Sequence, residues 1–281
     1  MKSFLMLGQS NMAGRGFLHE VAPIYNERIK MLRNGRWQMM TEPINYDRPV
    51  SGVGPAASFA DAWIRDNPGE EIGLIPCAEG GSSLDEWHVQ GTLFRHTISE
   101  VRFAMESSEI CGILWHQGES DSYHSLYKSY YEKLYTIIET LRKELCLPAV
   151  PFLIGELGEY LGKSGFGKSA VEFQEINQQL FRFADEEPNC YFVTAKGLTP
   201  NPDGIHLNAI SQRKFGYRYY RAFSQRQHVL EPLSDEDSLL ERNDRYTKNE
   251  RMYLHSMDLA LGKITYDAFE NEIKKMREDC F

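Results

Sequence analysis

Three polar residues of this sequence have the types and the order that nucleophilic catalysis by a serine requires. Ser10 lies in the stretch GQSNMAGRG, and Asp203 and His206 lie three residues apart in the stretch PDGIHLN. A serine hydroxyl is a poor nucleophile until a neighbouring base accepts its proton, and a third group must orient that base. The short spacing lets Asp203 and His206 share one tight turn. His206 could then accept from Ser10 through Nε2 while Asp203 accepts from its Nδ1–H, and the order Ser, Asp, His is a permissible one.

The same chemistry needs hydrogen-bond donors that stabilise the negative charge on the attacked carbonyl oxygen. Backbone N–H groups of Ser10 and of Gly80 or Gly81, in the stretch AEGGSS, are available because glycine lets the main chain approach a ligand closely. Gln117, in the stretch HQGESD, could add a side-chain amide. These residues are the candidates for an oxyanion hole.

Each member of the candidate triad also has a simpler structural interpretation when it is taken alone. Ser10 could cap a helix, or its loop could bind a phosphate, although GQSNMAGRG has neither the GKS or GKT ending nor the Rossmann glycine spacing. His206 and Asp203 could be ordinary turn residues. The joint occurrence of all three favours catalysis.

A metal site is the other chemistry that the polar residues could suggest. His116, Glu119 and His124 lie close in sequence, but the two histidines would straddle a strand end and a helix start, and no third nitrogen or sulfur ligand is nearby. We therefore expect no metal, and we interpret His116 as a structural residue.

Strands that alternate with helices must position these residues. Five short, nearly continuous apolar runs predict strands that are covered on both faces; they are Phe4–Leu7, Ile72–Cys77, Ile110–Trp115, Phe152–Gly155 and Tyr191–Thr194. Amphipathic stretches lie between them, the clearest over Asp121–Leu145. The pattern predicts an α/β fold with a five-stranded parallel sheet, whose ligands bind beyond the carboxyl ends of the strands. Four of the five runs lead into the polar stretches above, so these stretches should meet at one edge.

The last part of the chain has a different pattern. After residue 231 the sequence is rich in charged residues and contains no strand-like run. Leu259–Met276 predicts two helices broken at Gly262, with Thr265 as an N-cap and Phe269 on the apolar face of the second. We therefore divide the chain into an α/β domain over residues 1–228 and a small helical appendage over residues 229–281, which could pack on its own domain or join two copies of the chain.

Composition and charge limit the partners of the protein. Hydrophobic residues at 42% and charged residues at 25% are typical of a soluble globular protein. The formal net charge of −9 argues against nucleic acid as the main partner, and no apolar stretch approaches the roughly 20 residues needed to span a membrane. Five scattered cysteines without a CxxC pair favour reduced thiols, and MKSFLMLG is too short for a signal peptide, so we expect a cytoplasmic protein.

Four ordered stretches resemble the motif blocks of the SGNH hydrolases: GQSNMAGRG, PCAEGGSSLDEW, LWHQGESD and PDGIHLN. The chain is most similar to the sialate O-acetylesterase-like branch, which includes the acetylxylan esterases of carbohydrate esterase family 6. The first block reads GQSN where the wider superfamily has GDSL, and the third supplies Gln117 where the wider group has asparagine. The resemblance covers residues 1 to about 226. It implies a flavodoxin-like three-layer α/β/α fold, no metal or other cofactor, and hydrolysis of acetyl esters.

The resemblance also implies a role for single residues. It places the nucleophile on Ser10, the base on His206 and the acid on Asp203. Glu119 is a carboxylate that could replace or assist Asp203, or contact the substrate. Ser10, Gly81 and Gln117 would be the oxyanion donors. Four further residues of the blocks are candidates for contacts with the substrate: Gln9, Asn11, Gly80 and Trp87. Trp87 could stack on the face of a sugar, but it could equally be a packing residue.

We therefore expect a bacterial serine esterase that removes acetyl groups from a small saccharide, such as an acetylated xylan fragment or a sialate. A thioesterase or lysophospholipase of the same superfamily is an alternative, but it would need a long apolar groove, and the loops EGGSSLDEW and TPNPDG are polar. A non-catalytic sugar-binding module is a second alternative, although such a protein would be expected to lose at least one triad residue.

Overall fold

The computed structural model describes residues 1–240 and 246–278 of the chain. Its centre is a seven-stranded sheet with the order β3-β2-β4-β1-β5-β6-β7. The strands are β1 (Lys2–Gly8), β2 (Ile29–Arg33), β3 (Arg36–Met39), β4 (Ile72–Pro76), β5 (Glu109–His116), β6 (Phe152–Gly155) and β7 (Cys190–Val193). All neighbours are parallel except β2 and β3. β1 lies inside the sheet, where Leu5 pairs with Ile75 of β4 and with Ile113 of β5.

The predicted count of five strands is too low. The five apolar runs correspond to β1, β4, β5, β6 and β7, and the hairpin of β2 and β3 was missed. These two strands form the edge of the sheet, and β3 reads Arg-Trp-Gln-Met, which is not a continuous apolar run. The sequence signal that could have found these strands is the dipeptide Asn34-Gly35, because Asn-Gly is typical of a two-residue hairpin turn. In the structure both residues have the positive φ that such a turn requires.

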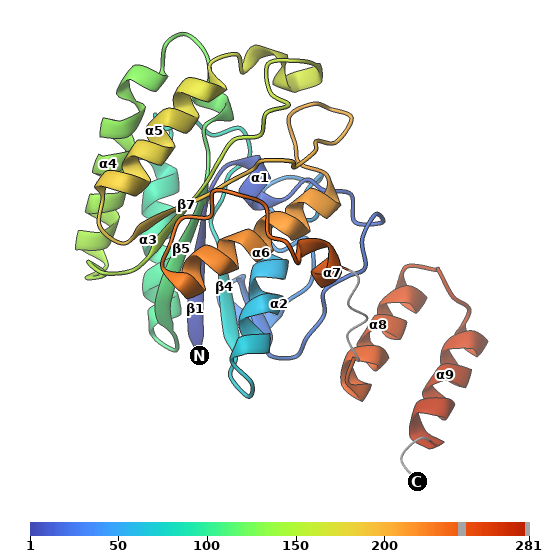
Figure 1. The fold of residues 1–281 in the computed structure, drawn as a ribbon. Helices are drawn as coiled ribbons and strands as arrows, with labels where there is room; N and C mark the ends of the chain where they lie inside the picture. The colour runs from blue at the N-terminus through green and yellow to red at the C-terminus, as the bar shows by residue number, and fades with distance from the viewer. Residues whose placement is uncertain (241–245, 279–281) are drawn as a thin grey trace.

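Helices cover both faces of the sheet, as Figure 1 shows. They are α1 (Ser10–Ala13), α2 (Ala56–Asp66), α3 (Thr92–Met105), α4 (Tyr127–Glu144), α5 (Phe173–Glu186), α6 (Ala209–Gln225) and α7 (Glu236–Leu240), with short 3₁₀ turns η1 (Glu119–Asp121) and η2 (Gly165–Ser169). The apolar residues of α3, α4 and α5 pack in one core cluster and those of α2 and α6 in another. The fold is therefore a three-layer α/β/α sandwich.

Alternate residues of each strand divide between these two cores. Leu5 and Leu7 of β1 point into the core under α3, α4 and α5, whereas Phe4 and Met6 point into the core under α2 and α6. This explains why the strand sequences are continuous apolar runs: both faces of the sheet are buried.

The helix predicted over Asp121–Leu145 begins later than expected. The polypeptide first forms η1 and then a turn in which His124 and Ser125 have left-handed φ values of +54° and +60°, so α4 starts only at Tyr127. The apolar positions of α4 do face the core, as predicted.

The segment that follows α6 still packs on the α/β sandwich. Val229 is buried and pairs with β7, and Glu236 of α7 forms a buried, two-pronged ion pair with Arg218 of α6. The division of the chain at residue 228 stays a prediction.

Two further helices, α8 (Lys248–Ala260) and α9 (Tyr266–Glu278), form a hairpin that lies at the margin of the molecule in Figure 1. Gly262 lies in the turn between them and Thr265 caps α9 through its hydroxyl, although α8 begins earlier than the predicted Leu259. Within residues 1–240 and 246–278, no helix is long and apolar enough to cross a membrane.

Candidate active site

Ser10 lies directly after the central strand, at a turn that only glycine permits. β1 ends at Gly8, whose φ is +124°, and a Cβ there would lie 2.0 Å from the carbonyl oxygen of His116. Glycine therefore lets β1 and β5 approach closely at this point, and the backbone N–H of Gln9 donates to the same carbonyl oxygen at 2.8 Å. The chain then turns into α1, of which Ser10 is the first residue, 5% exposed.

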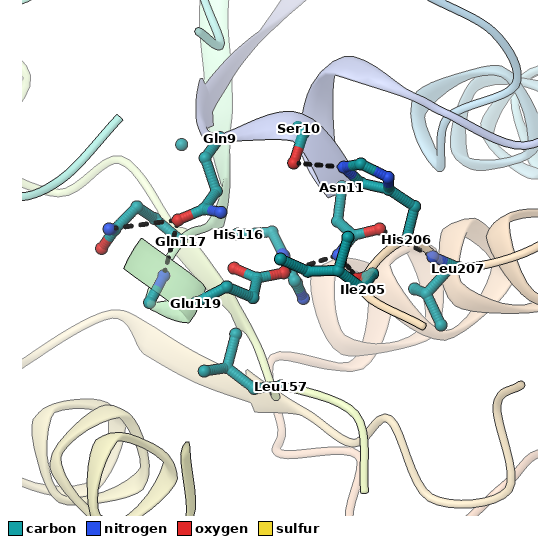
Figure 2. A network of polar contacts seen from close by, with 12 residues as sticks. Gln9, Ser10, Asn11, His116, Gln117, Glu119, Leu157, Ile205, His206 and Leu207 are labelled. Atoms are coloured by element: carbon teal, nitrogen blue, oxygen red, sulfur yellow. Dashed lines mark hydrogen bonds and ion pairs between the residues drawn. The ribbon is translucent and has the colours of Figure 1, made fainter. Parts of the chain in front are cut away.

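The structure brings Ser10, His206 and Asp203 into one hydrogen-bonded line. Ser10 Oγ lies 3.0 Å from His206 Nε2, which Figure 2 shows as a dashed contact. His206 Nδ1 lies 2.8 Å from Asp203 Oδ2. His206 and Asp203 belong to the loop between β7 and α6, so residues that are almost 200 positions apart in the sequence meet at one strand end.

The Asp203 carboxylate is held in its ionised form. Partial burial tends to raise its pKa, but hydrogen bonds from the backbone N–H and the ring of His206, and from the backbone N–H of Ile205, lower the pKa below its usual value. Oδ1 accepts the two backbone bonds, each 3.0 Å long, which leaves Oδ2 for the histidine ring. The turn thus fixes both the charge of Asp203 and the orientation of His206.

Asn11 connects the serine to both neighbours of the histidine. Its Nδ2 donates to the carbonyl oxygen of Ile205 at 3.1 Å, and its Oδ1 accepts from the backbone N–H of Leu207 at 2.9 Å (Figure 2). The side chain is buried, so the expected contact between Asn11 and substrate is not supported. Asn11 instead positions the segment that carries His206 relative to α1.

Glu119 has a different place from the one expected of a triad acid. Its Oε1 accepts from Asn11 Nδ2 at 2.5 Å and lies 3.7 Å from His116 Nδ1, and the carboxylate is buried. Asp203 already occupies the Nδ1 side of His206. The expectation that Glu119 replaces or assists Asp203 is therefore corrected: Glu119 fixes the orientation of the Asn11 amide.

Two backbone donors are available beside Ser10. The N–H of Ser10 is in the first turn of α1, where a helix supplies no acceptor, and the N–H of Gly81 donates to no group in the described part of the chain. Gly80 differs, because its N–H donates to Asp47 Oδ2 at 2.8 Å and its Cα faces Arg15 and Asp47. The expected substrate contact at Gly80 is thus corrected, whereas Gly81, with φ of +80° and open space around its Cα, remains accessible.

Gln117 does not present its amide to the reaction centre. It is 0% exposed, and its Nε2 donates to Asp121 Oδ2 at 2.6 Å and to the carbonyl oxygen of Ser82 at 3.1 Å. Its Oε1 accepts from the hydroxyl of Tyr130 at 2.9 Å. Because its amide is engaged inside the core, the expectation that Gln117 is an oxyanion donor is corrected.

The side chain of Gln9 is held by its oxygen alone. Gln9 Oε1 accepts from the backbone N–H groups of Gly118 and Ser120 and from the Gln117 amide, each at 3.3 Å. Figure 2 shows this oxygen turned towards Gln117, with the amide nitrogen on the opposite side. Gln9 is 1% exposed, but unlike the amides of Asn11 and Gln117 its nitrogen has no acceptor among the residues described, so its hydrogens are available to a group bound next to Ser10.

Trp87 is a core residue and not a sugar-binding one. It is 1% exposed, its Nε1 donates to Ser82 Oγ at 2.9 Å, and its ring packs edge-on against Trp115. The expected contact between Trp87 and a saccharide is therefore wrong, because no face of the ring reaches the surface.

A segment between α1 and α2 supports the glycine loop. We call residues 44–51 the supporting loop. Asn45 exchanges two hydrogen bonds with the backbone of Ala78, at 2.9 and 3.1 Å, and Asp47 accepts from the Gly80 N–H. These bonds fix the backbone on the N-terminal side of Gly81.

The supporting loop is in turn anchored to the serine segment. Arg15, five residues after Ser10, donates to both carboxylate oxygens of Asp47, at 3.1 and 2.5 Å, and both side chains are buried. Burial tends to raise the pKa of Asp47, but the Arg15 guanidinium and the Ser51 hydroxyl lower it below its usual value. No local sequence pattern could have shown this pair, because its partners meet only through the fold.

The residues that could have suggested a metal have other contacts. His116 Nε2 lies 3.1 Å from the carbonyl oxygen of Glu156, and its ring packs edge-on against Phe215. Within the described ranges, no group of three or more His, Cys, Asp or Glu side chains is arranged to hold a metal ion.

Comparison with protein families gives a match over the whole α/β sandwich. Residues 1–225 match the model of the family described as carbohydrate esterase, sialic acid-specific acetylesterase. A probable carbohydrate esterase of Arabidopsis thaliana is 30% identical over 247 residues, which cover 78% of this chain and 89% of the relative.

Solved structures agree with the fold. An Arabidopsis thaliana protein superposes with a TM-score of 0.70 at 29% identity, covering 80% of this chain and 98% of its own. NanS gives a TM-score of 0.66 at 19% identity, covering 80% of this chain and 96% of its own. A carbohydrate acetylesterase from Xanthomonas citri gives 0.60 at 21% identity, covering 78% of this chain and 55% of its own. At these lower identities the last two comparisons show a shared fold.

Proposed function

The chain belongs to the carbohydrate esterase family of sialic acid-specific acetylesterases, and from this membership and the site geometry we propose that it is a serine esterase that removes O-acetyl groups from a carbohydrate. The observation that carries the proposal is the line of contacts from Ser10 Oγ through His206 to Asp203, at 3.0 and 2.8 Å. This is the arrangement in which a histidine can take the proton of a serine hydroxyl.

In the proposed reaction, Ser10 Oγ attacks the acetyl carbonyl carbon while its proton moves to His206 Nε2. The tetrahedral intermediate collapses, the sugar oxygen leaves with the proton from His206, and the acetyl group remains on Ser10. A water molecule then attacks this ester, His206 accepts its proton, and acetate leaves as Ser10 regains its hydrogen. Asp203 stays ionised throughout and stabilises the protonated His206, in accord with its lowered pKa.

The oxyanion would be bound by the backbone N–H groups of Ser10 and Gly81 and by the side-chain amide of Gln9. The loop that carries Gly81 is bonded to the end of β1, because the Glu79 N–H donates to the Gly8 carbonyl oxygen at 3.0 Å. Neither backbone N–H has an acceptor among the described residues, and neither does the Gln9 nitrogen, whose oxygen is fixed. Gln9 takes the place that the sequence suggested for Gln117. Loss of one such donor typically costs about 100- to 1000-fold in rate.

The substrate we propose is a small acetylated saccharide. The family description names sialic acid, and the Xanthomonas citri structure is described as a carbohydrate acetylesterase. An acetylated xylan fragment is the other member of the same substrate class that the sequence motifs suggest. We also propose that the protein works in the bacterial cytoplasm, as its five scattered cysteines favour.

Two alternatives make different predictions for the same assay. A thioesterase or lysophospholipase would prefer long acyl chains, whereas an acetylesterase prefers acetate. A non-catalytic sugar-binding module would have no need of the triad, so the intact contacts of Ser10, His206 and Asp203 favour an enzyme.

The test compares hydrolysis of p-nitrophenyl acetate, butyrate and octanoate by the wild type and by Ser10→Ala, with EDTA present. We expect preference for acetate and a loss of several orders of magnitude in the variant. Preference for octanoate would support the long-chain alternative. Equal rates in the two proteins would exclude Ser10 as the nucleophile.

A further inference from the structure

Aromatic side chains are unusually exposed at two places beside the candidate active site. Of the described phenylalanine, tyrosine and tryptophan residues, the most exposed are Phe166 at 75%, Tyr46 at 68% and Tyr266 at 64%. Tyr266 lies on α9, away from the α/β sandwich (Figure 1). The other two lie on loops that are bound directly to the segments carrying Asp203 and Gly81.

Phe166 is held against the turn that carries the triad acid. Its backbone N–H donates to the carbonyl oxygen of Asp203 at 2.8 Å. The backbones pack so closely that a Cβ on Gly165 would lie 2.0 Å from the Asp203 carbonyl oxygen, and one on Gly167 would lie 2.1 Å from that of Gly204. These contacts fix the backbone from which the exposed Phe166 ring projects.

Tyr46 is held in a similar way on the other side. It lies in the supporting loop between Asn45, which is bound to Ala78, and Asp47, which is bound to Gly80. The guanidinium of Arg33 lies over its ring, 5.4 Å from the centroid, and restricts its orientation. The next apolar residue of the loop, Val50, is 72% exposed.

The order of the strands places the loops that carry these two rings on opposite sides of the strand that leads to Ser10. β4, which leads into the Gly81 loop, is the neighbour of β1 on one side, and β5, β6 and β7 follow on the other. Asn45 and Asp47, the neighbours of Tyr46, are bound to the loop after β4, and the backbone of Phe166 is bound to the loop after β7. Ser10, at the end of β1, lies between them.

We propose that Tyr46 and Phe166 form a sugar-binding platform that takes successive rings of an acetylated oligosaccharide on the two sides of Ser10. Single exposed apolar side chains are common on protein surfaces, but these two belong to loops that are hydrogen-bonded to the segments carrying Asp203 and Gly81. The C–H face of a pyranose can pack on an aromatic ring while its hydroxyl groups stay in water, and aromatic residues with a few polar groups are typical of ligand sites. This inference rests on the proposed function and replaces Trp87 as the aromatic contact.

The test measures kcat/KM for acetylated xylotetraose and for p-nitrophenyl acetate in the wild type, Phe166→Ala, Tyr46→Ala and the double variant. Tyr266→Ala is the matched control, because it removes a ring of similar exposure far from Ser10. We expect the ratio of the two kcat/KM values to fall about tenfold in each single variant and about 100-fold in the double variant, chiefly through KM. Phe166→Trp should retain the wild-type ratio.

The outcomes separate this inference from the proposed function. If the wild type hydrolyses both esters and the ratio stays constant in all variants, the platform is wrong while the esterase stands. A ratio that falls equally in Tyr266→Ala would also overturn it. If the wild type hydrolyses neither ester, the proposed function fails first.

Discussion

The buried pair of Arg15 and Asp47 provides a prediction in which stability and catalysis can be separated. Asp47 accepts the Gly80 N–H at 2.8 Å and so fixes the backbone next to the proposed oxyanion donor Gly81. Asp47→Leu removes this acceptor and leaves the Arg15 guanidinium buried without its partner. Breaking one side of a buried ion pair costs about 3–5 kcal/mol, which for a chain of this size lowers Tm by about 6 to 20 °C.

The double variant Arg15→Met/Asp47→Leu is the matched comparison. It removes both charges, and replacing a buried ion pair by apolar residues of similar volume is often nearly neutral for stability. The Gly80 N–H still lacks an acceptor, so we expect a remaining loss of about 1–3 kcal/mol. The stability of the double variant should therefore lie between those of the single variant and the wild type.

Catalysis should not recover with stability. In both variants the backbone next to Gly81 loses its bond to Asp47, although the Asn45 bonds to Ala78 remain, and a misplacement of about 1 Å in an active site can cost about 100-fold. We expect kcat for p-nitrophenyl acetate, measured well below each Tm, to fall about 10- to 100-fold in the single and the double variant alike. A stable double variant with wild-type kcat would refute the reasoning, since it would show that the bond from Asp47 to Gly80 has no effect on the oxyanion donors.

Three other predictions concern stability in acid, the hydrogen bonds of Asn11 to the backbone on both sides of His206, and the Trp87 ring. The pKa values of Asp47 and Asp203 are lowered in the folded state, so the unfolded chain binds more protons than the folded chain as the pH falls. The stabilisation by these two carboxylates should therefore be complete above roughly pH 4 and decline below it. Urea unfolding at a series of pH values measures this decline, which should be shallower in Asp47→Leu. Asn11→Ala should lower kcat about 10- to 100-fold at nearly constant KM, because the backbone on both sides of His206 loses its hydrogen bonds to α1. A changed KM with normal kcat would contradict this. Trp87→Phe should destabilise the fold by about 1 kcal/mol in thermal unfolding, because the hydrogen bond to Ser82 is lost. The KM for an acetylated saccharide should stay unchanged, and a raised KM would show that Trp87 contacts the sugar.

Local signals in the sequence were sufficient for the triad. Gly8 marks the end of a buried strand, and Asp203 and His206 lie in one short turn, so their mutual geometry depends on few degrees of freedom. The rule that parallel strands carry their ligands beyond their carboxyl ends then brought Ser10 into the same place. The structure confirms that these polar stretches meet.

Residues whose role depends on side-chain direction or on long-range contacts could not be predicted. Gln117 directly follows β5, and one step along a strand reverses the direction of a side chain, so the sequence could not tell whether its amide faces the site or the core. The supporting loop is a second example, because Asp47 meets Arg15 and Gly80 only after the segment between α1 and α2 has folded back. The hairpin of β2 and β3 was missed for a different reason: its edge position removes the continuous apolar pattern.

The measurement that tests the central claim most directly is the detection of the acyl-enzyme. The protein is mixed with excess p-nitrophenyl acetate, quenched in acid within the first turnovers, digested and analysed by mass spectrometry, with Ser10→Ala treated in parallel. The account predicts one added acetyl group on the peptide that contains Ser10 and none in the variant. Continued turnover of the wild type without acetyl on that peptide, or with the stable acetyl group on another residue, would contradict it.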